Sequence, residues 1–176
     1  MSDVLDHICI DLETLSTRSN AVIVTIAAVK FNFLGDTVEK FCINVNPREG
    51  KLLGLHISKE TLDWWRLQRP EATKAWMTSQ VGLGDALDQL DAFCGPSKHT
   101  MYYSQGINFD FPILESSYEV LERQSPWKFW NLRDTRTIYW LAGLDTKTEP
   151  RIGTYHNAID DCLTQIAWLK KSLGSK

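Results

Sequence analysis

The first third of the chain has the hydrophobic pattern of β-strands. Residues 21–31 (AVIVTIAAVKF) form an apolar run rich in β-branched residues, and residues 37–45 alternate between polar and apolar positions. A shorter apolar run precedes them at residues 7–12. The polar links between these runs are short, and Gly35 permits a turn in the second link, which is typical of an antiparallel meander.

The rest of the chain alternates between patterns typical of helices and of strands. Ser58 is a candidate N-cap for the first helix, and Pro70 starts the second. Helices are predicted at about 58–69, 71–78, 84–93, 109–121, 135–142 and 157–173, and further strands at 100–104 and 129–133. Three early strands followed by alternating strands and helices predict an α/β domain with a mixed sheet.

Length and composition favour one ordinary globular unit. A chain of 176 residues suits a single domain spanning residues 1–176, and 43% hydrophobic with 23% charged residues argues against disorder or a fibrous repeat. The net charge is −3, from 19 basic and 22 acidic residues. This balance argues against a broad basic surface that coats duplex DNA, so the site itself must attract any polyanion.

The chain shows no feature of an exported or membrane-bound protein. Its first residues lack the basic and apolar regions of a signal peptide, and no stretch approaches the roughly 20 apolar residues that span a bilayer. The four cysteines form no CxxC pair. We therefore expect a cytoplasmic protein with reduced, mostly buried thiols and no membrane partner.

Two carboxylates lie at the end of the first predicted strand. Asp11 and Glu13 alternate with the apolar Ile10 and Leu12, so both point to one face, about 7 Å apart along the strand. Such close carboxylates repel each other unless a cation lies between them, and Mg²⁺ takes oxygen ligands of this kind. The pair indicates a metal site, and the alternative is a solvated strand end with a helix or turn cap.

Two further polar groups lie where strands end and helices begin. Asp110 follows a strand and the turn at Gly106, and its alternative role is to stabilise the N-terminus of a helix. His156, Asp160 and Asp161 lie at the start of the last helix, where acids are common. Helical geometry would pair His156 with Asp160 only if His156 were itself helical. Spacing alone does not choose between Asp160 and Asp161.

Together these groups supply at least four acids and one histidine. Each lies at a strand end or helix start, where α/β sheets usually place their sites. The inventory suits two divalent metal ions about 3.5–4 Å apart that clamp a phosphate, with a base near neutral pKa that activates water.

The ordered set DLET at 11–14, NFD at 108–110 and HNAIDD at 156–161 resembles the DEDDh family of 3′–5′ exonucleases. The third motif of that family, H-x-A-x-x-D, fits His156, Ala158 and Asp161 and selects Asp161 over Asp160. The resemblance covers nearly the whole chain. It implies a ribonuclease H-like fold, a mixed five-stranded sheet of three antiparallel strands and then two parallel strands, flanked by helices.

Within the family, the chain is most similar to the small exonuclease VIII-like group, which includes bacterial and phage proteins and a mycobacterial exoribonuclease. This closer match is carried by DLET with Ala21-Val22-Ile23, by ETLDWW at 60–65 and by LRDTR at 132–136.

The resemblance also implies a mechanism with two Mg²⁺ ions, for which Mn²⁺ would substitute. Asp11 would bridge both ions. Glu13 and Asp161 would hold the ion that carries the attacking water, and Asp110 would support the other ion. His156 would accept the proton of that water as general base. The products would be nucleoside 5′-monophosphates released from single-stranded DNA or RNA 3′ ends.

The sequence indicates the residues of the nucleotide pocket less directly than the metal ligands. Thr14 and Leu15 follow the first two ligands, where the family contacts the terminal nucleotide, and His56 lies in a segment resembling one that touches substrate in relatives. Asn108 could meet the terminal sugar. Trp64 could stack a base, a contact of ~1–3 kcal/mol, or it could pack in the core.

Two other functions fit the same residues. The site could act on very short oligonucleotides or on a dinucleotide, or an idle module could keep the fold for dimerisation or for binding a partner nuclease. Four mutually repelling carboxylates count against an idle site. No residue that senses the 2′-hydroxyl can be named, so the sequence does not distinguish DNA from RNA. A homodimer is suggested by relatives and allowed by the aromatic content.

Overall fold

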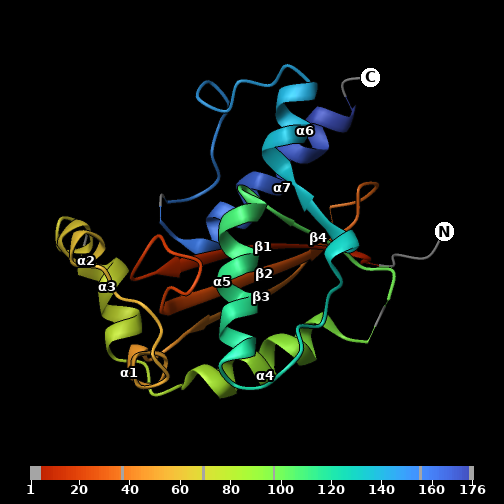
Figure 1. Ribbon diagram of the computed structural model, residues 1–176. Coiled ribbons are helices and arrows are strands. Elements are labelled where there is room, and N and C mark those ends of the chain that lie inside the picture. Colours follow the sequence, from red (N-terminus) through yellow and green to blue (C-terminus); the bar gives the residue numbers. More distant parts are fainter. Residues whose placement is uncertain (1–4, 37, 69, 97, 155, 175–176) are drawn as a thin grey trace.

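A five-stranded mixed sheet forms the centre of the protein in a computed structural model that describes residues 5–36, 38–68, 70–96, 98–154 and 156–174. The strand order is β3-β2-β1-β4-β5 (Figure 1). The strands are β1 (His7–Thr14), β2 (Ile23–Phe31), β3 (Val38–Asn44), β4 (Met101–Ser104) and β5 (Leu132–Asp134). The first three pair antiparallel, and β4 and β5 continue parallel to β1, which confirms the predicted sheet.

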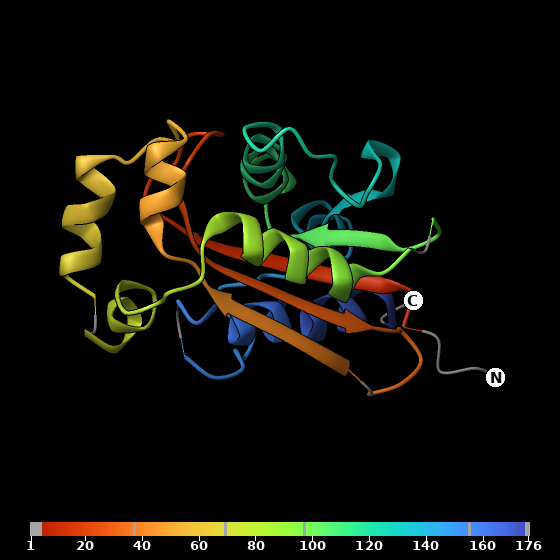
Figure 2. The same ribbon diagram turned by 90° about the horizontal axis from the view of Figure 1, so that it is seen from below.

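Helices cover both faces of the sheet (Figures 1 and 2). On one face lies α7 (Ala158–Gly174), with α6 (Thr135–Leu141) packed against it, and on the other lie α4 (Leu83–Cys94) and α5 (Ile107–Glu119). The remaining helices are α1 (Pro47–Leu52), α2 (Lys59–Arg66) and α3 (Pro70–Met77). The segment before α2 lies beside the carboxyl end of β1, where the Ser58 N–H donates to the Leu15 carbonyl at 2.8 Å.

Alternation along β1 divides the interior into two apolar layers. Ile8, Ile10 and Leu12 belong to the core beneath α4 and α5, and Cys9 belongs to the core beneath α7. Side chains two residues apart on a strand share a face. Asp11 and Glu13 therefore point to the α7 side of the sheet, where α7 begins.

Two elements differ from the sequence expectation. The predicted strand over 129–133 is wrong in its first part, because Phe129–Asn131 form a 3₁₀ helix and only Leu132–Asp134 pair with β4. The short β4 offers pairing positions only from Tyr102 to Ser104, so the ladder cannot extend further. Helix α1 was not predicted, since six residues are too few to show a helical period, although its Asn46 cap and Pro47 mark its start.

All four cysteines are free thiols. Cys9, Cys94 and Cys162 are buried and Cys42 is exposed, which confirms that the thiols are mostly buried. In the parts of the chain that the structure describes, no helix combines the length and apolar character needed to cross a bilayer.

Candidate active site

The end of β1 and the start of α7 bring three acids together. Asp11, Glu13 and Asp161 each offer one carboxylate oxygen, and these three oxygens lie within 4.8 Å of one another. Asp161 joins this group, whereas Asp160 accepts a hydrogen bond from the Thr154 N–H at 2.8 Å. The helix begins only at Ala158, so His156 is not helical and the conditional i,i+4 pairing with Asp160 does not apply.

Asp110 approaches from α5 on the other side of the sheet. Strand β4 ends at Ser104 while β1 continues to Thr14, which leaves part of the β1 edge without a neighbouring strand. There the Leu12 N–H donates to Asp110 Oδ1 at 3.2 Å, and Asp110 is only 4% exposed. The fourth predicted acid is therefore fixed directly to the strand that carries the first two.

A glycine is needed where the chain turns from β4 into α5. Gly106 has φ 111°, in the left-handed region that favours glycine. A Cβ atom at this position would lie 3.1 Å from Arg136 Nη1. The turn allows α5 to begin close enough for Asp110 to reach β1.

Burial and mutual repulsion disfavour the charged form of these acids. Burial raises the pKa of Asp11 well above its usual range, and the Asp110 and Glu13 carboxylates raise it further. Burial also raises the pKa of Glu13 to about 7, with a contribution from Asp110, and the pKa of Asp110 to about 7. A hard divalent cation binds oxygen ligands and stabilises their ionised form. This group of buried, mutually repelling carboxylates is therefore suited to hold one.

The raised pKa of Glu13 predicts a pH-dependent loss of stability without metal. Its folded pKa of about 7 exceeds the ordinary value of 4.5, so its contribution to stability is present below about pH 4.5 and lost as pH rises through 7. In ion-free buffer, we expect Glu13→Gln to gain melting temperature over the wild type across this window. The gain should be about 2–8 °C, or ~1–2 kcal/mol after allowance for partial exposure.

Thermal unfolding at several pH values in the presence of a chelator measures this difference. The lowered pKa values of His7 and His156 act in the opposite direction, but they are common to both proteins and cancel in the comparison. A difference in melting temperature that stays constant from pH 4.5 to 8 would contradict the raised pKa of Glu13.

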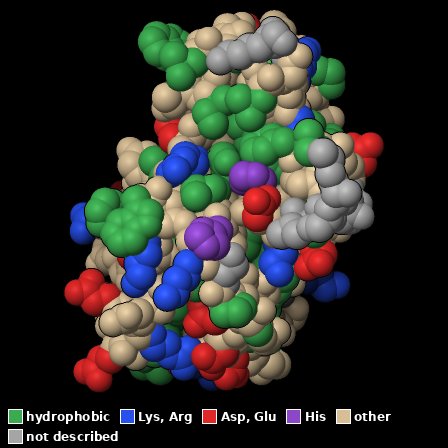
Figure 3. All heavy atoms as spheres, turned by 90° about the vertical axis from the view of Figure 1, so that its right-hand side faces the viewer, with side chains coloured by type: hydrophobic (Ala, Val, Ile, Leu, Met, Phe, Trp, Pro, Cys, Tyr) green, Lys and Arg blue, Asp and Glu red, His purple; other side chains and the backbone are tan. Residues whose placement is uncertain are grey.

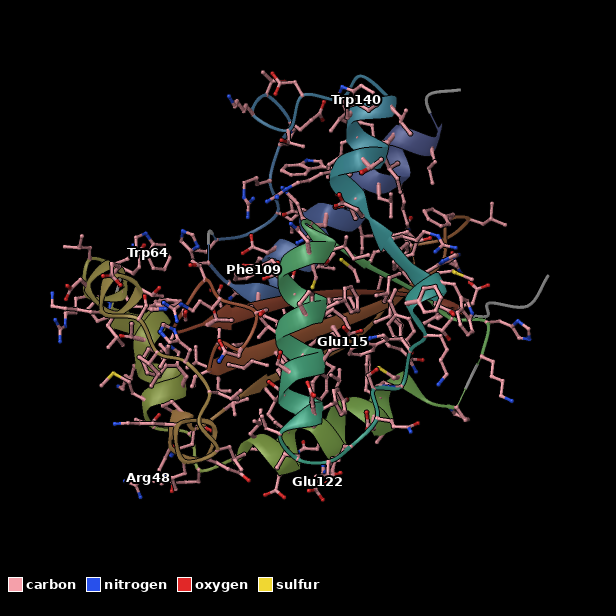
Figure 4. The ribbon with its side chains drawn as sticks, in the orientation of Figure 1. Arg48, Trp64, Phe109, Glu115, Glu122 and Trp140 are labelled. Atoms are coloured by element: carbon pink, nitrogen blue, oxygen red, sulfur yellow. The ribbon has the colours of Figure 1, made fainter. Side chains whose placement is uncertain are left out.

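A cleft of about 740 Å³ extends from Glu13 toward α2. Trp64 on α2 and Phe109 on α5, labelled in Figure 4, both line it. The other lining residues are Leu12, Glu13, Thr14, Ser16, Thr17, Arg18, His56, Ile57, Ser58, Lys59, Glu60, Thr61 and Trp65. Hydrogen bonds fix its wall: Trp65 Nε1 donates to the Thr14 carbonyl at 2.9 Å, and Ser16 Oγ lies 2.7 Å from His56 Nδ1.

The predicted nucleotide-binding residues are only partly brought together. Thr14, His56 and Trp64 line the cleft. Leu15 is 2% exposed and packs in the core, and Asn108 is exposed at the start of α5 outside the set of cleft-lining residues. Phe109 was not selected from the sequence, although its position beside Asp110 could have indicated it.

His156 lies in the turn before α7 and contacts α2. Its ring packs edge to face on Trp64, with centroids 4.8 Å apart and an interplanar angle of 88°. Its φ of 61° is unusual for a residue other than glycine, and such strain costs of order 1–3 kcal/mol and recurs at active sites. Partial burial and then the Arg151 charge lower the pKa of His156, which keeps the imidazole neutral at pH 7.

Arg151 adds a cation beside the acidic group. Its Nη2 atom forms an ion pair with Asp161 Oδ1, and its guanidinium lies 5.9 Å from the Trp168 ring centroid. Nothing in the local sequence marks this arginine, because it lies ten residues before its partner in an irregular segment.

Basic side chains do not form a continuous surface on the face shown in Figure 3. Lysine and arginine side chains there are interspersed with acidic and apolar ones. At the cleft, Arg18 and Lys59 lie among the lining residues. Glu13 and Glu60 also line the cleft, and Lys59 pairs with Asp63, so the basic side chains of the lining are balanced by acidic ones.

Comparisons with solved structures define the fold. The fold is similar to the nuclease domain of 3′hExo, a DEDDh family member solved with rAMP bound, with a TM-score of 0.63, 13% identity, and coverage of 96% of this chain and 91% of that one. It is also similar to Pop2p of S. pombe in a Mg²⁺- and Mn²⁺-bound form, with a TM-score of 0.58, 12% identity, and coverage of 94% and 82%. The fold is thus the ribonuclease H-like fold of DEDDh nucleases.

The chain belongs to the family of Rv2179c-like 3′–5′ exoribonuclease domains, whose sequence model matches residues 6–173. It is 27% identical to the exodeoxyribonuclease of Enterobacteria phage T4, with coverage of 93% of this chain and 87% of the phage protein. The DEDDh resemblance is confirmed, and the protein is a 3′–5′ exonuclease.

Proposed function

We propose that this exonuclease removes nucleoside 5′-monophosphates from single-stranded 3′ ends with two divalent cations. The convergence of the Asp11, Glu13 and Asp161 oxygens within 4.8 Å carries the proposal. Asp110 extends the group, since its charge raises the pKa of both Asp11 and Glu13. Four carboxylates around two dications leave the site close to neutral, which would let an acidic protein hold a phosphodiester.

The roles proposed for the acids are those that the resemblance to DEDDh exonucleases implies. We assign Asp11 to both ions, Glu13 and Asp161 to one ion, and Asp110 to the other. The ions, when bound, would sharpen an attacking water and stabilise the departing 3′ oxygen. The Mg²⁺- and Mn²⁺-bound form of S. pombe Pop2p, which shares the fold, supports these two metals.

His156 is the proposed general base. Its neutral imidazole can accept a proton at pH 7, and its ring packs edge to face against Trp64. His156 lies in the turn before α7, so the helical spacing that orients Asp160 and Asp161 does not determine the direction of its side chain.

The terminal nucleotide would occupy the cleft beside Glu13. Thr14, His56 and Trp64 are the proposed contacts along its wall, and Asn108 would reach the sugar from the start of α5. Leu15 would support the wall from below, because its side chain is buried and its backbone carbonyl is bonded to Ser58.

The same proposal includes a cytoplasmic location and a homodimer. Exposed Phe129, Trp130 and Trp140 supply apolar surface that a second copy could bury. Both DNA and RNA are proposed substrates, since the family is described as exoribonuclease while the phage relative is an exodeoxyribonuclease.

Hydrolysis is expected to depend entirely on added divalent metal. End-labelled single-stranded DNA and RNA of matched sequence, incubated with Mg²⁺ or Mn²⁺, should each give a ladder of shortened 3′ ends, and excess EDTA should stop it. Side-by-side rates establish the preferred sugar. Hydrolysis of only two- to five-residue oligomers would replace the proposal with an oligonucleotide phosphodiesterase, and no hydrolysis of any substrate would favour an idle module.

A further inference from the structure

Gln165 contacts the candidate metal site from inside the protein. It lies on α7 one helical turn after Asp161 and is 3% exposed. Its side-chain amide bridges two residues on the same face of β1. Nε2 donates to Asp11 Oδ1 at 2.9 Å, and Oε1 accepts from the Cys9 thiol at 3.3 Å.

The surrounding groups fix the orientation of this amide. A thiol can donate a proton, whereas the ionised Asp11 carboxylate that a bound cation would favour only accepts, so in that form Oε1 faces Cys9 and Nε2 faces Asp11. The reversed amide would place its oxygen against a carboxylate oxygen. The backbone is held as well, because the Tyr139 hydroxyl donates to the Gln165 carbonyl at 2.9 Å.

We propose that Gln165 is a positioning residue that fixes the Asp11 carboxylate for divalent-cation binding. The inference rests on the proposed function, which assigns Asp11 to both ions. Asp11 faces the like charges of Glu13 and Asp110, so an unrestrained carboxylate would tend to rotate away from them. The Gln165 amide opposes that rotation.

A neutral donor suits this position better than a cation. The Nε2 group satisfies one lone pair of Asp11 and leaves the second oxygen available. It brings no positive charge that would compete with the ions, unlike Arg151, which pairs directly with Asp161. Outer hydrogen bonds of this kind orient metal ligands, and their loss typically costs about 10–100-fold in metal affinity.

Calorimetric titration with Mn²⁺ tests the proposal independently of catalysis. Gln165→Met keeps the length of the side chain but has no amide to donate to Asp11, and Gln165→Leu also removes the amide. We expect each to bind Mn²⁺ about 10–100-fold more weakly than the wild type. High Mg²⁺ should restore part of the lost hydrolysis rate, which a purely structural defect would not allow.

Two further variants keep the result interpretable. Ser172→Ala removes another buried polar group of α7 and should bind Mn²⁺ as the wild type does. Cys9→Ala frees the other end of the amide and leaves Asp11 in place, so it should bind Mn²⁺ more weakly than the wild type but more tightly than Gln165→Leu. If the Gln165 variants do not fold, wild-type Mn²⁺ affinity of Cys9→Ala overturns the positioning role.

The outcomes separate this inference from the proposed function. Wild-type Mn²⁺ affinity in every folded variant of Gln165 and Cys9, together with weakened binding in Asp11→Asn, would overturn the positioning role alone. Equal Mn²⁺ binding by the wild type and Asp11→Asn would remove Asp11 from the ion site and overturn both.

Discussion

Asp11→Ala is expected to abolish hydrolysis while the ion-free protein remains about as stable as the wild type. The change removes the carboxylate shared by the two proposed ions, so no cation can be held in a productive place. It also removes the group whose pKa is raised by burial, Asp110 and Glu13, and this relief of repulsion offsets the lost packing. End-labelled substrates and thermal unfolding in chelator measure the two effects.

Asp11→Asn and Asp160→Asn serve as controls for this result. The amide oxygen of Asp11→Asn can still accept the Gln165 hydrogen bond, so it separates loss of charge from loss of contact. Asp160→Asn removes a neighbouring negative charge outside the three-acid group and should leave hydrolysis nearly unchanged. Severe unfolding of Asp11→Ala in metal-free buffer, or substantial residual hydrolysis, would contradict the ligand role.

The sequence contained enough information for the sheet and for the meeting of the acids. Period-two alternation placed Asp11 and Glu13 on one face of β1, and that face is the one that α7 covers. The resemblance to DEDDh exonucleases selected Asp161, and the structure places its oxygen beside the other two. These features are visible because they depend on local spacing and on short motifs.

Gln165 and Arg151, which contact the acids, were not predicted from the sequence. Gln165 contacts Asp11 across 154 sequence positions, and no period marks it among the apolar residues of α7. Arg151 lies in an irregular segment. Leu15 is the converse case. Its place after the DLET motif predicted a nucleotide contact, but its side chain packs in the core. Tertiary packing decided all three positions.

His156→Ala is expected to lower turnover by ~10²–10⁴-fold while Mn²⁺ binding stays close to that of the wild type. The imidazole lies outside the three-acid group, and burial with the Arg151 charge keeps it neutral and able to accept a proton. Single-turnover hydrolysis and calorimetry report the two quantities separately. His99→Ala removes an exposed histidine between α4 and β4 and should retain full turnover. Wild-type turnover of His156→Ala would remove the imidazole from proton transfer, whereas a loss of Mn²⁺ binding equal to that of Asp11→Asn would make His156 part of the ion site instead.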